Sequence, residues 1–480
     1  MGLGRRSVWL VISQMVELGL QVILPVILVR HLTMEAFGDY RLLWLIAAGC
    51  AGMLPMGMPD TLALFLPKSK QLDQQRYVAV TAAYMLLIGI VSGIGVAAAM
   101  HWWGPTEGLR ALAGAGALFT VLWVSGGMID YLPVADERGD WQARAVIALA
   151  ILRTVLAGAA AYWYGSVVAV FYMLAVVAGV RLCLIWNYAR KHHHLGHTAP
   201  TRWHWQSQSA QAMPLGLSSL LISVRRQADQ WIAAALFGTV QFAVFSLGAV
   251  FGSLVLMMRR AISSTFMPSM SKHEASGDWH AVIDTNNRAN LIVAFFAVPV
   301  LAFIWCFGEP IYTLIYTSTY VGAVPVMRIL VVSWLLQIVE LNSLVLLAGQ
   351  MRYSARISGP LLLVSLVISF VGGYTLGLVG AASGGVIMAV LERSLILRKL
   401  ASSLQWPLSK LQAWGSLLSM ITLCWGLAAL GRLGYEYRPA SIPPLVGMIL
   451  TGVIIALPYL LIARKRGWLP HKIIPAPVAN

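Results

Sequence analysis

Residues 77–100 of this chain read YVAVTAAYMLLIGIVSGIGVAAAM, a run without a charged side chain. An α-helix rises about 1.5 Å per residue, so a run of this length crosses the ~30 Å hydrocarbon layer of a bilayer. Comparable runs recur through all 480 residues, of which 59% are hydrophobic and 11% charged. In an ordinary soluble domain, about a quarter of the residues are charged. The sequence therefore predicts an all-α membrane protein with many spans and excludes a soluble fold.

Working outward from this run, the hydropathy pattern predicts about fourteen transmembrane helices with short connections. The predicted spans are 7–29, 40–64, 77–100, 111–133, 144–163, 166–189, 212–237, 242–265, 289–307, 324–347, 356–377, 379–400, 412–430 and 443–463. Because the number is even, both termini are expected on the same side of the membrane.

The basic residues predict which side that is. In the connections, 21 Lys and Arg residues fall on one side of the membrane, and the other side holds only Arg30, Arg41, Arg110, Arg432 and Arg438. Short loops rich in Lys and Arg stay cytoplasmic, so both termini are predicted to be cytoplasmic. This asymmetry accounts for most of the net charge of +16 without a nucleic acid partner.

Metal-ligating and redox patterns are sparse. The four cysteines, Cys50, Cys183, Cys306 and Cys424, all lie in apolar runs without paired spacing, so neither a disulfide nor a zinc site is predicted. The longest inward connection, residues 190–211, contains five histidines: His192, His193, His194, His197 and His204. A solvated linker is the ordinary interpretation of such a segment, with a metal site as the alternative. We expect no cofactor.

A weak internal repeat suggests how the spans are grouped. Phe37-Gly38-Asp39-Tyr40 follows the first span, and Phe242-Ala243-Val244-Phe245 follows the seventh, 205 residues later (242 − 37). The same offset maps six spans onto the next six, which predicts two parallel six-helix repeats around a central cavity. The predicted parts are an N-terminal bundle (1–189), a cytoplasmic linker (190–211), a C-terminal bundle (212–400), and two extra helices with a cytoplasmic tail (401–480).

Several short segments, taken in order, resemble a known superfamily. Over about residues 7–400 the chain is similar to the multidrug/oligosaccharidyl-lipid/polysaccharide exporters, and within them to the bacterial oligosaccharide flippases. One departure is Thr33, which stands where the family pattern has a first Gly. The segments that carry the resemblance are 29–40 (VRHLTMEAFGDY), 57–64 (GMPDTLAL), 226–232 (RQADQWI), 308–312 (GEPIY), 347–353 (LAGQMRY) and 377–382 (GLVGAA).

The resemblance implies a function. It implies a flippase of the bacterial cytoplasmic membrane that translocates undecaprenyl-diphosphate-linked oligosaccharide for O-antigen, capsule or exopolysaccharide synthesis. Such a protein is not an enzyme; it acts as a monomeric transporter, with a polysaccharide polymerase and a chain-length regulator as possible membrane partners. Two alternatives remain open: a lipid II flippase or multidrug/cation antiporter of the same superfamily, and a membrane-embedded polysaccharide polymerase or transferase. Against the second, the sequence shows no catalytic motif and no large outer loop.

Cationic residues within the spans are the candidates for substrate binding. An ionised side chain at the bilayer centre costs about 3 kcal/mol on insertion scales, so such residues should face a cavity or a partner. Arg225 and Arg226 lie four and three residues before Asp229, so one arginine is left over if the other pairs with this carboxylate. The surplus guanidinium and Arg153 would bind a diphosphate. The alternative for the span-seven residues is a purely structural charge cluster.

Carboxylates at membrane depth are candidates for ion coupling or for pairing with these arginines. They are Glu17, Asp60, Asp130, Glu340 and Asp229. Glu17 and Glu340 are preferred because both are predicted near mid-span. Arg259 and Arg260, near the inner end of span eight, are expected to contact anionic lipid headgroups instead.

Overall fold

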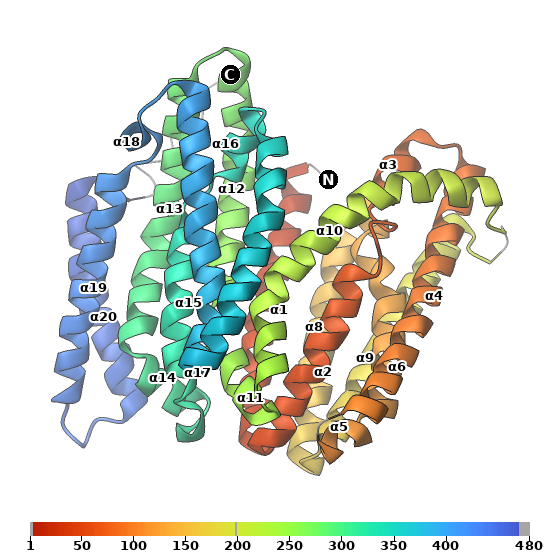
Figure 1. Ribbon diagram of the computed structural model, residues 1–480, viewed down its shortest axis with the longest axis horizontal. Coiled ribbons are helices and arrows are strands. Elements are labelled where there is room, and N and C mark those ends of the chain that lie inside the picture. The colour runs from red at the N-terminus through yellow and green to blue at the C-terminus, as the bar shows by residue number, and fades with distance from the viewer. Residues whose placement is uncertain (1–2, 105, 197–198, 470–480) are drawn as a thin grey trace. The chain divides into compact units, whose positions relative to one another are not determined.

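The computed structural model describes residues 3–104, 106–196 and 199–469. Every regular element in these ranges is a helix (Figure 1). The chain divides into two compact units, residues 1–243 and 244–480. They are called unit 1 and unit 2 and are described separately.

Unit 1 consists of long apolar helices with short elements between them. Inside it α4 packs on α6, α1 on α8, α9 on both α6 and α8, and α10 on α2. The helices are α1 (Leu3–His31), α2 (Met34–Met53), α3 (Leu62–Phe65), η1 (Leu66–Lys68), α4 (Gln71–Trp103), α5 (Glu107–Ala111), α6 (Ala113–Ser125), η2 (Gly126–Asp130), α7 (Leu132–Ala135), α8 (Gly139–Tyr164), α9 (Val167–His193), α10 (Arg202–Leu236) and α11 (Thr239–Gly248), the last of which continues into unit 2.

Unit 2 follows the same design, and α13 lies at its centre against α12, α15 and α19. Tyr459 of α20 donates a hydrogen bond to the carbonyl of Phe295, so the last two helices are packed into the unit. The helices are α12 (Gly252–Ala275), α13 (Trp279–Cys306), α14 (Gly308–Ile315), η3 (Ser318–Tyr320), α15 (Ala323–Ile338), α16 (Asn342–Leu347), α17 (Met351–Leu404), α18 (Leu408–Leu411), α19 (Trp414–Glu436) and α20 (Pro444–Arg466).

Turns between spans fall where the sequence predicts them. Gly165 has a φ of 57° and ends α8 in the left-handed conformation, which glycine adopts without steric cost. α10 ends at Leu236, one residue before the predicted Phe237–Gly238 turn. Within α17, Gly377 has φ 63° and ψ −144°, so this element is two helices joined at the predicted boundary of spans eleven and twelve.

The predicted polytopic all-α fold is therefore confirmed. By length and composition alone, eight of the described helices qualify as membrane spans, and three of the described segments are shorter apolar helices: Gly19–His31, Thr239–Gly248 and Ala323–Ile338. In chain order the fourteen predicted spans correspond to α1, α2, α4, α6, α8, α9, α10, α11 with α12, α13, α15, the two arms of α17, α19 and α20.

Two spans are broken in ways that position polar groups. After α2 the chain leaves the helix at residues 54–61, where Met56 and Gly57 have φ of 45° and 71°. Pro55 and Pro59 in this segment lack the amide hydrogens that a continuous helix needs. The second break separates α15 from α16 at residues 339–341. Breaks of this kind are tolerated at membrane depth where the freed backbone faces protein or a cavity.

Candidate functional site

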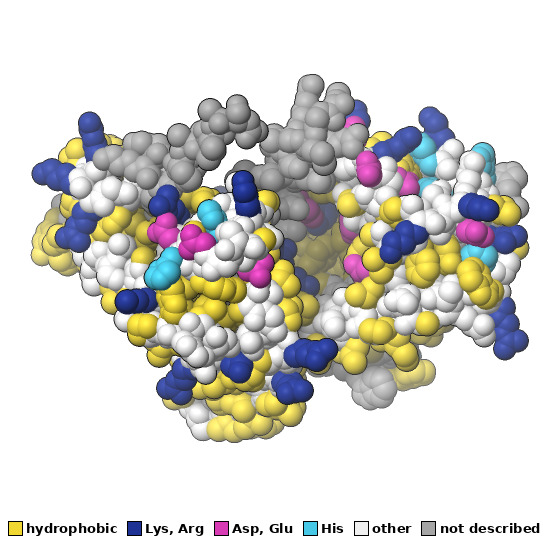
Figure 2. Space-filling model, turned by 90° about the horizontal axis from the view of Figure 1, so that it is seen from above, with side chains coloured by type: hydrophobic (Ala, Val, Ile, Leu, Met, Phe, Trp, Pro, Cys, Tyr) yellow, Lys and Arg dark blue, Asp and Glu magenta, His cyan; other side chains and the backbone are white. Residues whose placement is uncertain are grey.

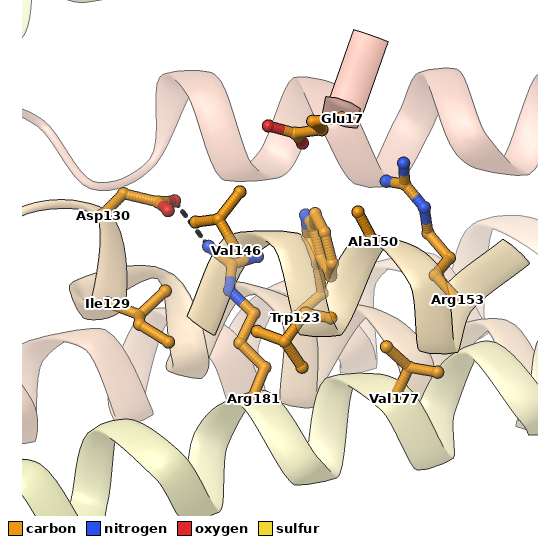
Figure 3. A pocket seen from close by; sticks show the side chains of 10 residues that line it. Glu17, Trp123, Ile129, Asp130, Val146, Ala150, Arg153, Val177 and Arg181 are labelled. Atoms are coloured by element: carbon orange, nitrogen blue, oxygen red, sulfur yellow. Dashed lines mark hydrogen bonds and ion pairs between the residues drawn. The ribbon is translucent and has the colours of Figure 1, made fainter. Parts of the chain in front are cut away.

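A cavity of about 90 Å³ lies within unit 1, between α1, α6, η2, α8 and α9. Its wall is largely apolar, with Ile129, Val146, Leu149, Ala150 and Val177 among its residues. The charged side chains of the wall come from four different elements, and Figure 3 shows them around one space. They are Glu17, Asp130, Arg153 and Arg181.

Arg153 is the most exceptional of these residues. It projects from the middle of α8, it is 5% exposed, and its guanidinium lies over the ring of Trp44, 5.7 Å from the centroid. Its Nε and Nη2 atoms are buried and have no hydrogen-bond partner among the described residues. Leaving a buried donor unsatisfied costs about 1–3 kcal/mol, and more for a charged group. An anion that enters the cavity would supply the acceptors that the protein does not.

Arg181 of α9 faces the same cavity but already has a partner. Its Nη2 lies 2.5 Å from Oδ2 of Asp130, and its guanidinium lies 4.2 Å from the ring centroid of Trp123. Arg181 is not among the site residues predicted from the sequence. The signal that could have found it is the one that selected Arg153, namely a basic residue inside an apolar run, here residues 166–189.

Glu17 completes the charged set. It projects from α1 across the cavity from the two arginines (Figure 3), and its Oε1 accepts a hydrogen bond from Nε2 of Gln21, at 3.5 Å. When Glu17 and Asp130 are both ionised, they balance the two arginines, and the net charge of the cavity is zero. Protonation of Glu17 would leave the cavity with one net positive charge and would favour an anionic ligand.

The remaining predicted site residues of unit 1 lie in the segment after α2 and on α10. Asp60 is exposed in the irregular segment after α2, and Arg226 is exposed on α10. Arg225 and Asp229 lie on α10 as well and are half-buried. Unit 1 thus contains all the predicted site residues except Glu340.

Glu340 lies in unit 2, at the break between α15 and α16. Its two carboxylate oxygens accept hydrogen bonds from the backbone amides of Asn342 and Ser343, both at 3.0 Å. Its own amide donates to Oδ1 of Asn290, also at 3.0 Å. The Nη1 atom of Arg259 lies 3.5 Å from Oε1 of Glu340, so Arg259 pairs with a protein carboxylate where the sequence had suggested a lipid headgroup. The nearby exposed Arg260 remains available to lipid.

Two histidines of the predicted linker contact carboxylates within unit 1. His193 lies 2.8 Å from Asp136, and His204 lies 3.1 Å from Asp73. Figure 2 looks onto this end of the molecule, where histidine side chains lie among acidic and basic ones. Among residues 3–104, 106–196 and 199–469, no three His, Cys, Asp or Glu side chains are placed to hold a metal ion. His197, which the sequence analysis included, lies outside these ranges.

The apolar helices and the charged cavity within unit 1 define a polytopic all-α membrane protein. The chain belongs to the polysaccharide biosynthesis protein family, which matches residues 3–274. No curated protein matches the sequence.

Solved structures agree on the fold. Lipid II flippase MurJ in an inward closed conformation has a TM-score of 0.69 at 12% identity, over 96% of this chain and 99% of that one. An inward-facing multidrug resistance MATE family transporter of the MOP superfamily has a TM-score of 0.59 at 16% identity, over 82% and 99% of the two chains. A Vibrio cholerae MATE transporter has a TM-score of 0.57 at 13% identity, over 83% of this chain and 96% of that one. The superfamily resemblance that the sequence predicts is confirmed.

Proposed function

We propose that this protein is a flippase that carries a polyprenyl-diphosphate-linked oligosaccharide from the inner to the outer leaflet of a bacterial cytoplasmic membrane. The observation that carries the proposal is the buried guanidinium of Arg153, whose Nε and Nη2 have no hydrogen-bond partner among the described residues. Membership of the polysaccharide biosynthesis family supports a sugar-bearing substrate. The fold shared with a lipid II flippase supports a lipid-linked one.

In this proposal the diphosphate binds the arginines of unit 1. Arg153 donates from its unsatisfied nitrogens, and Arg181, held by Asp130, provides a second positive charge. A guanidinium offers parallel N–H donors that match two phosphate oxygens, which an ammonium group does not. Arg225 and Arg226 extend this cationic region onto α10, with Asp229 as their charge partner.

The acidic residues are proposed to control the charge of the site. Glu17 faces the cavity and would take up a proton as the anion binds, whereas Asp60 and Asp130 balance the neighbouring arginines. Glu340 serves unit 2 as a helix cap and as the partner of Arg259. The direction of transport needs no ion gradient in principle. Two negative charges that move outward through an inside-negative potential gain up to about 4.6 kcal/mol per 100 mV, at ~2.3 kcal/mol each.

A leaflet assay in proteoliposomes tests the function. A fluorescent undecaprenyl-diphosphate oligosaccharide is incorporated, and its appearance in the opposite leaflet is followed by chemical quenching under an imposed potential. We expect Arg153→Gln to slow transfer at least about tenfold, since one charge-assisted hydrogen bond contributes roughly 1.5–3 kcal/mol.

Arg144→Gln is the matched control, because Arg144 lies on the same helix, is 69% exposed, and pairs with Asp140 four residues away. It should transfer within about twofold of the unaltered protein, since exposed ion pairs contribute little. Equal rates for the Arg153 and Arg144 variants would exclude the proposed site. Transfer of a cationic drug, with no transfer of any lipid-linked sugar by folded protein, would replace the proposal by multidrug export.

A further inference from the structure

The helix α10 packs on α2 through its C-terminal half, on the irregular segment 54–61 through its middle, and on α4 near its start. Figure 1 shows α10 as a bent helix, and Pro214 within it accounts for the bend. Small residues bring the two backbones together. A Cβ atom added at Gly216 would lie 2.2 Å from the carbonyl oxygen of Met56, and one at Gly57 would lie 2.7 Å from the amide nitrogen of Gly216. Towards the other end, a Cβ at Gly49 would lie 2.9 Å from the Trp231 ring.

Buried polar contacts reinforce this packing. Gln208 of α10 is 0% exposed, and its Nε2 donates to the hydroxyl of Thr61 at 2.9 Å and to that of Thr81 at 2.7 Å. Thr61 lies directly before α3 and Thr81 on α4. The Ser223 hydroxyl donates to the carbonyl of Gly52 at 3.0 Å. His204, 3.1 Å from Asp73, joins the first turn of α10 to the first turn of α4.

These contacts lie at both ends and in the middle of α10. A motion that separated α10 from α4 and from Thr61 would leave the amide of Gln208, the two threonine hydroxyls or the Asp73–His204 pair without these partners. A motion that separated α10 from α2 would leave the Ser223 hydroxyl without the Gly52 carbonyl. Buried polar groups that lose their partners are disfavoured, and more so where no water can replace them.

We propose that α10 is a fixed part of the moving body formed by unit 1, so that the chain flexes after α10 and not in the 190–211 connection. The flexing segment would be 237–251, which contains the Phe237–Gly238 turn, the short helix α11 and the turn at 249–251. One consequence is that Arg225, Arg226 and Asp229 travel with Arg153 and Arg181. The inference is independent of which substrate is carried.

A disulfide between α2 and α10 tests the proposal. A Cβ at Gly52 would lie 3.5 Å from the Cβ of Ser223, which is the separation found in disulfides. The four native cysteines are first replaced by serine or alanine, and Gly52→Cys and Ser223→Cys are combined. Gly93→Cys with Val121→Cys is the matched control, because it joins α4 to α6 with the same Cβ separation of 3.5 Å.

Transfer of the lipid-linked sugar is compared for each pair in its oxidised and reduced forms. The oxidised α2–α10 variant should flip within about twofold of its reduced form, as the α4–α6 control does. Loss of transfer on oxidation that reduction restores, for the α2–α10 pair alone, would overturn the proposal.

A distance measurement makes the test independent of the substrate and of disulfide formation. Spin labels at the exposed positions Met213 of α10 and Leu87 of α4 should give one distance that does not change with membrane potential or added lipid. A reference pair with one label at Leu87 and the other at Leu418 of unit 2 shows that the units have moved. A second distance for Met213–Leu87 under conditions that shift the reference pair would contradict a fixed α10. If the distances behave as expected but no sugar lipid is transferred, the proposed function fails and the mechanical inference stands.

Discussion

The Nη2 atom of Arg181 lies 2.5 Å from Oδ2 of Asp130, and this pair divides the roles of the two arginines in the unit 1 cavity. Arg181 is compensated by a carboxylate and by the ring of Trp123. Arg153 faces Glu17 across the cavity and lies near the ring of Trp44, but its Nε and Nη2 have no hydrogen-bond partner among the described residues. A guanidinium with unsatisfied donors in a cavity is suited to a ligand that brings anionic oxygens.

Because Nε and Nη2 of Arg153 lack hydrogen-bond partners among the described residues, replacing Arg153 should change stability and transfer in opposite directions. Replacing Arg153 by Met keeps much of the apolar stem and removes the unsatisfied donors, so the free energy of unfolding should rise by roughly 1 kcal/mol. Transfer of the lipid-linked sugar should fall at least about tenfold. Thermal unfolding in detergent and the leaflet assay measure the two effects. A variant that is both less stable and inactive would indicate that Arg153 serves the fold.

We expect a different result for Asp130→Asn, because this substitution removes the partner of the buried Arg181 guanidinium. Asp130 is half-exposed, so water replaces part of the lost interaction, and a loss of about 1–2 kcal/mol in unfolding free energy is expected. The double variant Asp130→Asn with Arg181→Met should recover most of that stability while transfer stays low. If the double variant is no more stable than Asp130→Asn alone, the pair does not stabilise unit 1.

Hydropathy predicted the helical fold and most span boundaries, because both follow from the cost of exposing polar groups to lipid. The orientation that the basic residues indicate stays a prediction. Arg153 and Glu17 were found as charges inside apolar runs, and unit 1 places them at one cavity. Arg181 gave the same signal and was missed. The partner of Arg259 could not be predicted, because Glu340 is about 80 residues away in sequence (340 − 259 = 81) and only the break before α16 brings the two together. No local pattern encodes contacts of that range.

Glu340→Gln tests the role of the broken span in unit 2. The amide can still accept one hydrogen bond at the start of α16, but it loses the charge that faces Arg259, so we expect a loss of about 1–3 kcal/mol in unfolding free energy. Asn290→Ala should give a loss of similar size, because Oδ1 of Asn290 accepts from the Glu340 amide. Thermal unfolding of the purified protein measures both. A Glu340→Gln variant with unchanged stability but lost transfer would instead assign Glu340 to ion coupling.

Gly216→Ala tests how closely α10 must approach the segment 54–61 that follows α2. The added methyl group would lie 2.2 Å from the Met56 carbonyl oxygen and cannot be accommodated unless the two backbones separate. Alanine is the better helix former, by roughly 1 kcal/mol, so an unpacked glycine in a helix should gain stability on the same substitution. Gly95→Ala on α4 is that control, since no atom lies within 4 Å of the added Cβ. We expect Gly216→Ala to lower the unfolding temperature and Gly95→Ala to leave it unchanged or to raise it. If Gly216→Ala is as stable as the control, the backbones are not in contact at this point, and α10 does not pack closely on the segment 54–61.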